Sequence, residues 1–358
     1  MNQDSLLEIQ NLRVSFPLDE GKVQAVNGVD LTIKRGQVLG VVGESGCGKT
    51  VTAQSVLRII PAPGRIDSGK ILFRPPDTSE PRVSDRVLDL AQLKPNSEEL
   101  RRIRGNDIAM IFQEPMSSFS PVHTVGSQIM EAILLHQNVG KKAALDRTIE
   151  LLGLVGIPNA QERVDNYPHQ FSGGMRQRAM IAMALSCNPS LLIADEPTTA
   201  LDVTIQAQIL DLMRRLQQQF GMAVMFITHN LGVIAQIADS VAIMYLGQVV
   251  EQGPVREILR NPKHPYTMDL LRAVPRLGKT AGQRLVAIEG SLPSPFRRPT
   301  GCPFHPRCSK MIPGVCNTHV PELIQLNEIH SVRCVLYEPN IPQPQLESVD
   351  VRAAPTVA

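Results

Sequence analysis

The stretch GESGCGKT, at residues 43–50, gathers residue types that bind phosphate. Its glycines let backbone N–H groups turn toward one point, and a helix that begins here adds a positive dipole end. In this Walker A pattern, Lys49 reaches the terminal phosphates of a nucleotide and the Thr50 hydroxyl ligates Mg²⁺. We interpret Cys47 as a small residue that the loop tolerates, not as a metal ligand. The sequence therefore predicts that the whole loop binds nucleotide, through Gly43, Glu44, Ser45, Gly46, Cys47, Gly48, Lys49 and Thr50.

Two carboxylates end a second apolar run, LLIADE, at residues 191–196. Asp195 would stand at the carboxyl end of a strand, where open α/β sheets bind their ligands, and can hold Mg²⁺ directly or through water. Glu196 is one residue further along and can act as the general base for an attacking water. A carboxylate pair after a strand says little alone, but together with a phosphate loop it predicts nucleotide hydrolysis.

A second phosphate-binding element is predicted within QFSGGMRQRAMIAMAL, residues 170–185. Here Ser172, Gly173 and Gly174 would begin a helix with a free hydroxyl and bare backbone N–H groups, which suits an anion. One chain thus has more phosphate-facing groups than one nucleotide needs. We therefore expect two chains to pair head to tail, each placing this helix start over the nucleotide of the other. The alternative is an ordinary N-capped helix with flexible glycines.

A parallel sheet is needed to position these residues. The runs 37–43, 190–196 and 222–229 are apolar on both faces, as buried parallel strands are, and residues 205–220 repeat apolar side chains at helical spacing. Residues 74–105 are polar and indicate an insertion or a loop that leads into a strand. Strands that alternate with helices predict an α/β fold.

The composition sets limits on partners and location. Apolar residues make up 43% of the chain, charged residues 20%, and the net charge is +2, which gives no reason to expect a nucleic-acid partner. The first ten residues lack the basic and apolar regions of a secretion signal, and no apolar run approaches the length of a membrane span. We therefore expect the protein in the cytoplasm.

The motifs resemble, in type and order, those of the ATP-binding subunits of ABC transporters over about residues 6–255. The resemblance covers the Walker A loop, Gln113 in MIFQEP, the signature FSGGM at 171–175, the strand that ends in Asp195 and Glu196, TALD at 199–202, and His229 in FITHN. The family's signature usually reads LSGGQ, so its first and last residues differ here. The resemblance implies a P-loop NTPase fold: a parallel-sheet core, an antiparallel β subdomain and a helical signature subdomain at about 114–180.

The same resemblance implies roles for three further residues and a substrate, ATP with Mg²⁺. Gln113 would sense the γ-phosphate or Mg²⁺ and couple the site to a membrane partner. His229 would contact the γ-phosphate and help to hold the attacking water; a neutral amide and an imidazole suit these tasks. Phe16, in RVSFPL, would stack on adenine; the alternative for a lone Phe is a place in the core.

The segment after the ATP-binding domain, 1–255, narrows the resemblance. HPYT at 264–267 and the extension at 256–340, rich in proline and cysteine, resemble the ATPase subunits of dipeptide/oligopeptide importers, a group that includes nickel importers. This implies two transmembrane permease subunits, a second ATPase subunit that is related but different, and an extracytoplasmic solute-binding protein. The chain would then lie at the cytoplasmic face of the inner membrane. The solute stays open between di- or oligopeptides and nickel or another small solute, and residues 341–358 are predicted to be a disordered tail.

Two other classes of protein fit the motifs less well. Soluble ABC ATPases of translation or DNA repair typically have two ATPase halves or a long coiled coil, whereas this chain has one set of motifs and no heptad run. A P-loop metabolic kinase needs neither the signature nor Gln113. Both alternatives predict ATPase activity that does not depend on a permease.

The extension holds four of the chain's six cysteines, beginning in GCPFHPRC at residues 301–308. Cytoplasmic thiols are normally reduced, so a cysteine cluster there favours metal binding over disulfides. Zinc is one possibility, although its structural sites usually take two ligands from a C-x₂₋₄-C pair. Wider gaps suit a [4Fe–4S] cluster, and the importer group includes members whose four-iron cluster is held by four such cysteines. We expect a structural rather than catalytic cluster, because the segment is far along the chain from the ATP motifs; unrelated buried thiols are the alternative. The predicted ligands are Cys302, Cys308, Cys316 and Cys334.

Overall fold

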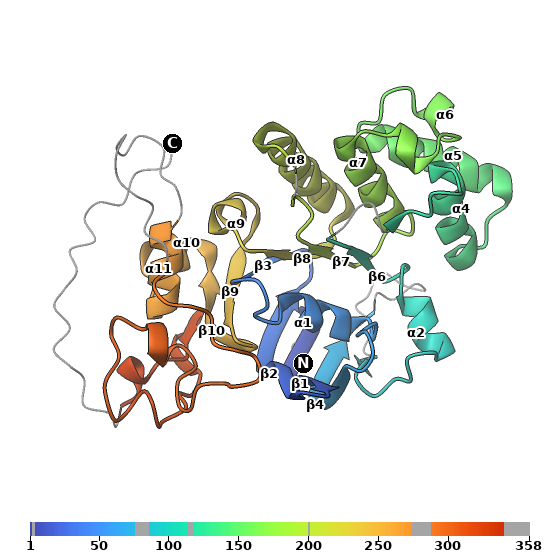
Figure 1. The fold of residues 1–358 in the computed structure, drawn as a ribbon. Helices are drawn as coiled ribbons and strands as arrows, with labels where there is room; N and C mark the ends of the chain where they lie inside the picture. The colour runs from blue at the N-terminus through green and yellow to red at the C-terminus, as the bar shows by residue number, and fades with distance from the viewer. Residues whose placement is uncertain (2–3, 76–85, 114–117, 200, 274–287, 340–358) are drawn as a thin grey trace.

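The computed structural model describes residues 1, 4–75, 86–113, 118–199, 201–273 and 288–339 (Figure 1). In these residues, a central sheet has the strand order β11-β12-β10-β9-β3-β8-β7-β6. Its strands β9, β3, β8, β7 and β6 are parallel, and the other three are antiparallel. Their bounds are β3 Val38–Val42, β6 Ile108–Ile111, β7 Leu191–Asp195, β8 Ala223–Thr228, β9 Ser240–Tyr245, β10 Gln248–Pro254, β11 Ile324–Asn327 and β12 His330–Val332.

A second, antiparallel sheet has the order β2-β1-β4-β5 and packs on one face of the first. It comprises β1 Ser5–Leu18, β2 Gly21–Lys34, β4 Arg65–Phe73 and β5 Leu88–Asp89. Helix α1, Lys49–Val56, lies between the two sheets in Figure 1 and buries Ala53 and Val56 in their shared core. The phosphate loop therefore connects β3 to α1, and both elements are anchored in this apolar core.

The other face of the central sheet is covered by helices. Helix α8, Val203–Phe220, buries Ile209, Leu212 and Leu216 at helical spacing, and α9 spans Leu231–Ile237 beside it. A group of helices lies beyond β6 and β7, at the upper right of Figure 1: α4 Val125–His136, α5 Lys141–Leu154, α6 Ala160–Arg163 and α7 Gly173–Ala184. The short α2, Glu98–Ile103, precedes β6.

The C-terminal part continues the central sheet. Helices α10, Val255–Arg260, and α11, Pro265–Ala273, follow β10, and β12 then pairs with β10 at Glu251 and Gln252. Two 3₁₀ turns, His305–Arg307 and Val335–Tyr337, occur in the extension. Its buried Phe304 belongs to the same apolar core as β9 and α11, so this segment shares a core with the ATP-binding part.

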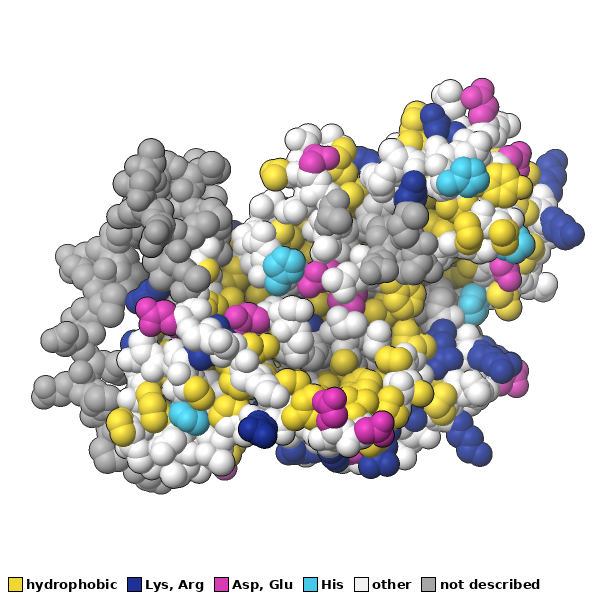
Figure 2. Space-filling view, in the orientation of Figure 1, with side chains coloured by type: hydrophobic (Ala, Val, Ile, Leu, Met, Phe, Trp, Pro, Cys, Tyr) yellow, Lys and Arg dark blue, Asp and Glu magenta, His cyan; other side chains and the backbone are white. Residues whose placement is uncertain are grey.

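The predicted strands at 37–43, 190–196 and 222–229 and the helix at 205–220 are confirmed by β3, β7, β8 and α8. The described part of 74–105, predicted as an insertion or loop, leads into the strand β6 as expected but also contains β5 and α2. Residues 114–117 of the predicted helical subdomain and the predicted tail at 341–358 lie outside the described residues. On the face drawn in Figure 2, basic and acidic side chains are interspersed. Among the described residues, no helix has the length and apolar character to span a membrane.

Candidate nucleotide site

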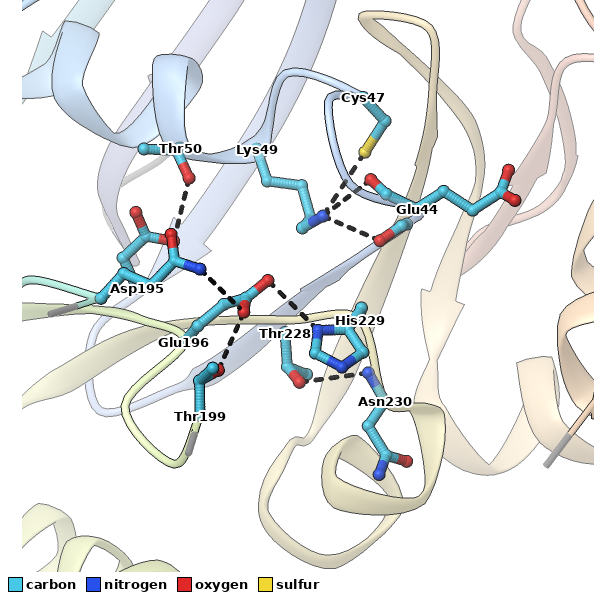
Figure 3. Close-up of polar contacts among 12 residues, drawn as sticks. Glu44, Cys47, Lys49, Thr50, Asp195, Glu196, Thr199, Thr228, His229 and Asn230 are labelled. Carbon is cyan, nitrogen blue, oxygen red and sulfur yellow. Dashed lines mark hydrogen bonds and ion pairs between the residues drawn. The ribbon is translucent and has the colours of Figure 1, made fainter. Parts of the chain in front are cut away.

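The phosphate loop lies at the carboxyl end of β3, and its glycines are required by the backbone around them. A Cβ on Gly43 would stand 2.2 Å from the Met244 carbonyl oxygen. Gly48 has φ +97°, and a Cβ there would stand 2.3 Å from the Ala25 carbonyl oxygen. The buried Lys49 donates from Nζ to the carbonyl oxygens of Gly43 and Glu44, at 2.8 and 3.0 Å (Figure 3). This ammonium group is thus held over the loop by acceptors that phosphate oxygens can replace.

Cys47 is fully buried within the loop, and its Sγ is 3.7 Å from Lys49 Nζ. Burial raises the pKa of this thiol. The cysteine therefore packs as a small, neutral side chain.

A cavity of about 140 Å³ opens over the loop. It is lined by Ala25, Ser45, Gly46, Gly48, Lys49, Thr50, Val51, Gln113 and Glu196. The structure thus brings together residues from the Walker A loop, the glutamine motif and the end of β7, which lie far apart in the sequence.

Asp195 ends β7 as predicted and faces the start of α1. Its Oδ1 accepts a hydrogen bond from Thr50 Oγ1 at 3.2 Å. The carboxyl group is almost completely buried, and this burial raises its pKa, partly offset by the Thr50 hydrogen bond. A hydroxyl and a carboxylate side by side, in a buried place, form a donor pair of the kind that Mg²⁺ uses.

Glu196 is the point where several polar side chains meet (Figure 3). Its Oε2 accepts from Thr199 Oγ1 at 2.8 Å and from Gln113 Nε2 at 3.3 Å. Its Oε1 is 3.2 Å from His229 Nδ1, and the Glu196 side chain is only 13% exposed. Thr199 was not predicted as a site residue. It is the first residue of the TALD motif and follows Glu196 by only three positions, a spacing that could have indicated the contact.

The signature residues are built as expected but do not reach this cavity within one chain. Ser172 caps α7 by accepting a hydrogen bond from the Met175 backbone N–H at 3.3 Å. Ser172, Gly173 and Gly174 are absent from the lining of the cavity in this chain. Phe16 is also absent from that lining; it is half-buried at the edge of the core, so adenine stacking stays a prediction.

Glu44 connects the loop to the C-terminal extension. Its carboxylate accepts from Arg307 Nη1 at 2.7 Å and Nη2 at 3.1 Å. Its backbone N–H donates to Tyr266 Oη at 3.0 Å. Tyr266 belongs to HPYT and Arg307 to GCPFHPRC, so distance along the chain does not keep these segments away from the nucleotide site. Neither contact was predicted, because no local pattern reports on residues 222 or 263 positions apart.

The four extension cysteines are all free thiols. Three are buried and Cys308 is half-buried. In the part of the chain that the structure describes, no three His, Cys, Asp or Glu side chains form a group that could hold a metal ion. The four-cysteine cluster therefore stays a prediction.

Comparison with known proteins supports the ATP site and the extension. The family model described as "ABC transporter" matches residues 26–199, and that described as "Oligopeptide/dipeptide transporter, C-terminal region" matches residues 250–316. A putative peptide import ATP-binding protein of Brucella ovis is 50% identical over 344 residues, which cover 94% of this chain and 99% of the relative. The dipeptide transport ATP-binding protein DppD of Bacillus subtilis is 48% identical over 337 residues, 94% of this chain and 96% of the relative.

Solved structures share the fold. A dimeric ATP-binding cassette in a post-hydrolysis state, bound to ADP and Pi, superposes with a TM-score of 0.60 at 23% identity, over 70% of this chain and 99% of that one. The phosphate loop, the carboxylates after β7 and the full-length relatives agree: the chain belongs to the family of ATP-hydrolysing subunits of dipeptide/oligopeptide ABC importers.

Proposed function

We propose that this chain uses Glu196 as the general base of ATP hydrolysis and that the importer it powers takes up dipeptides or oligopeptides. The observation that carries the catalytic part is the convergence of Gln113, Thr199 and His229 on one carboxylate beside the phosphate loop. The solute is proposed from the names of the relatives, two of which are a peptide import and a dipeptide transport ATP-binding protein.

Each of these residues has a separate role in ATP binding or hydrolysis. Lys49 binds the terminal phosphates when these replace its two carbonyl acceptors. Glu196 accepts the proton of the attacking water, and His229 and Thr199 orient its carboxylate. Gln113 reports whether the site is filled, because its amide can leave Glu196 for a ligand.

The Mg²⁺ ion would be held by Thr50 and Asp195, with Gln113 as a further oxygen ligand. When bound, Mg²⁺ neutralises charge on the phosphate oxygens. The hydrogen bond of 3.2 Å between Thr50 and Asp195 supports this assignment, since it holds two oxygen ligands side by side.

Hydrolysis requires a second ATPase subunit. Ser172, Gly173 and Gly174, at the capped start of α7, are not among the residues that line the chain's own cavity, which supports their use on the nucleotide of a partner. We propose a related but different chain as this partner, by resemblance to importers that work with two ATPases.

The membrane partners are two permease subunits, supplied with solute by an extracytoplasmic binding protein, and the chain sits peripherally at the cytoplasmic face of the membrane. Helix α4 leaves Leu134 and Leu135 exposed, and they line an open groove with Met130, Ser127, Glu131 and Lys141. Figure 2 shows hydrophobic side chains gathered over this group of helices, at the upper right. An exposed apolar groove of this kind suits a segment of a membrane subunit.

The four extension cysteines are proposed to hold a [4Fe–4S] cluster. Burial, and in addition the charges of neighbouring cysteines, raise the pKa of Cys308 and of Cys334 to about 12. The Ile312 backbone N–H donates to Cys316 Sγ at 3.2 Å, a contact typical of cluster ligands. A positively charged iron centre would stabilise the thiolates that burial disfavours.

The catalytic proposal is tested with Glu196→Gln, which keeps the shape and hydrogen bonds of the side chain but removes the base. We expect ATP binding to persist and the hydrolysis rate to fall about 10²-fold or more, the usual range for loss of a general base. Phosphate release and nucleotide binding, measured on the complex with its permeases, separate the two effects. Hydrolysis at a near wild-type rate would show that another group is the base.

The cluster is tested by anaerobic purification, with absorbance near 400 nm and analysis of iron, sulfide and zinc. Iron and sulfide at about four per chain, as the cluster's composition requires, and their loss in Cys308→Ser, would support the proposal. One zinc per chain without colour would replace it with a zinc site, and neither metal would leave four buried thiols.

A further inference from the structure

Glu44, the second residue of the phosphate loop, uses all three of its polar groups. Its backbone carbonyl accepts from Lys49 Nζ at 3.0 Å. Its backbone N–H donates to Tyr266 Oη, and its carboxylate binds both terminal nitrogens of Arg307. Figure 3 shows this carboxylate turned away from Lys49. One residue therefore joins the phosphate-binding lysine to two side chains of the C-terminal part.

Arg307 is itself held in place. Its side chain is 3% exposed, and its Nε donates to the Glu289 carbonyl oxygen at 3.1 Å. The guanidinium lies 5.9 Å from the centre of the Tyr245 ring. Tyr245, Tyr266 and Phe304 pack against one another with ring centres 4.8 to 5.4 Å apart. The arginine is thus fixed on an aromatic platform that β9, α11 and the extension build together.

A two-point Arg–carboxylate pair fixes orientation as well as position. With this pair in place, the loop holds its shape before nucleotide arrives. Without it, ATP would have to order the loop on binding, and that ordering cost would appear as weaker affinity. The chemical step would change little, because neither side chain lines the cavity where the phosphates bind.

We propose that Arg307, together with Tyr266, is a positioning residue for ATP: it holds the phosphate loop in its binding conformation through Glu44. The extension is therefore a component of the nucleotide site, whether or not its cysteines carry a cluster. This inference rests on the assignment of residues 43–50 as the ATP-binding loop.

The test measures the Kd for ATP, KM and kcat in Arg307→Gln, Glu44→Gln and the double variant. We expect each single variant to raise Kd and KM about tenfold, as for loss of one charge-assisted contact, with kcat within about twofold. The double variant should bind ATP no more weakly than either single one, since all three lack the same pair. Arg307→Lys, which keeps the charge but not the fork, should lie in between, and Tyr266→Phe should show a smaller rise in KM.

Arg333→Gln is the matched control. Arg333 also directly precedes an extension cysteine, but it donates to the carbonyl oxygens of Val249 and Pro321. The Arg333→Gln substitution should lower the melting temperature and leave the Kd for ATP unchanged. Equal weakening in Arg333→Gln, or losses that add in the double variant, would reduce Arg307 to a structural role and overturn the proposal. Lys49→Ala tests the ATP site separately from the role of Arg307. If Lys49→Ala bound ATP normally, residues 43–50 would not be the ATP-binding loop.

Discussion

Glu196 has φ +47°, a backbone conformation that residues other than glycine rarely adopt. Such a conformation costs a non-glycine residue about 1–2 kcal/mol. The cost is tolerated where it sets a functional geometry. Here it turns the carboxylate from the end of β7 toward Gln113, Thr199 and His229. The positive φ is therefore consistent with the role proposed for Glu196 and does not by itself establish that role.

Thr199 gives the residue-scale prediction. Its hydroxyl makes the shortest of the contacts to Glu196, at 2.8 Å. Thr199→Val keeps the shape and removes that donor. We expect kcat to fall roughly threefold to tenfold, as for one hydrogen bond to a charged group, while KM for ATP stays the same. Steady-state kinetics of the purified complex check this. A rise in KM with an unchanged kcat would instead place Thr199 in substrate binding.

At the scale of elements, the sequence predicted what depends on local pattern. Uniformly apolar runs predicted β3, β7 and β8, and helical spacing predicted α8. The nucleotide site followed because parallel strands end at a common edge. The addition of β12 to β10 was not predictable, because a strand of three residues is too short to leave a pattern and its partner lies about 80 positions away along the chain. The same holds for the Arg307–Glu44 pair, which depends on how the extension folds back.

A buried carboxylate joins three of these elements. Glu251, on β10, accepts from the backbone N–H groups of Lys263 and His264 at 2.6 and 3.0 Å, ahead of α11. It also pairs with His330 Nε2, on β12, at 2.8 Å. Both ring side chains and the carboxylate are fully enclosed. This junction fixes HPYT against the sheet and so also places Tyr266 at the phosphate loop.

The junction should make stability depend on pH. Burial lowers the pKa of His264 from 6.5 to about 4. His264 is therefore protonated below about pH 6.5 in the unfolded chain but only below about pH 4 in the folded chain. The free energy of unfolding should thus fall as pH drops through this window, by at most roughly 3 kcal/mol from this group. The Tyr266 backbone N–H donates to His264 Nδ1 at 3.0 Å. His264→Asn, which keeps an acceptor for this N–H, should make the free energy of unfolding depend less on pH.

Chemical denaturation at pH 7 and pH 5 measures the effect. His123→Asn, at an exposed position, is the control and should leave the pH dependence as in the wild type. A variant at His264 whose stability falls as steeply as that of the wild type would mean that His264 does not cause this pH dependence.

At the scale of the whole molecule, the start of α7 is the feature that needs a second chain. Ser172→Arg would place a bulky group where the γ-phosphate of the partner's nucleotide must dock. We expect the variant to bind ATP at its own loop but to fail to form the closed dimer. Ser172→Ala is the matched control, because it removes the same cap, worth about 1 kcal/mol, without adding bulk. Closed dimers of Ser172→Arg, seen by size-exclusion chromatography with ATP and a base-deficient background, would contradict the head-to-tail arrangement.

The pairing of β12 with β10 has a consequence for the edge of the central sheet. Without residues beyond 255, β10 would be the outermost strand of the central sheet, with free N–H and C=O groups at Glu251 and Gln252. Exposed edges of this kind recruit strands from other molecules. Glu251 would also lose His330. By pairing with β10, the hairpin of β11 and β12 covers this edge. We therefore expect an ATP-binding domain that ends at residue 255 to aggregate more readily than the longer chain.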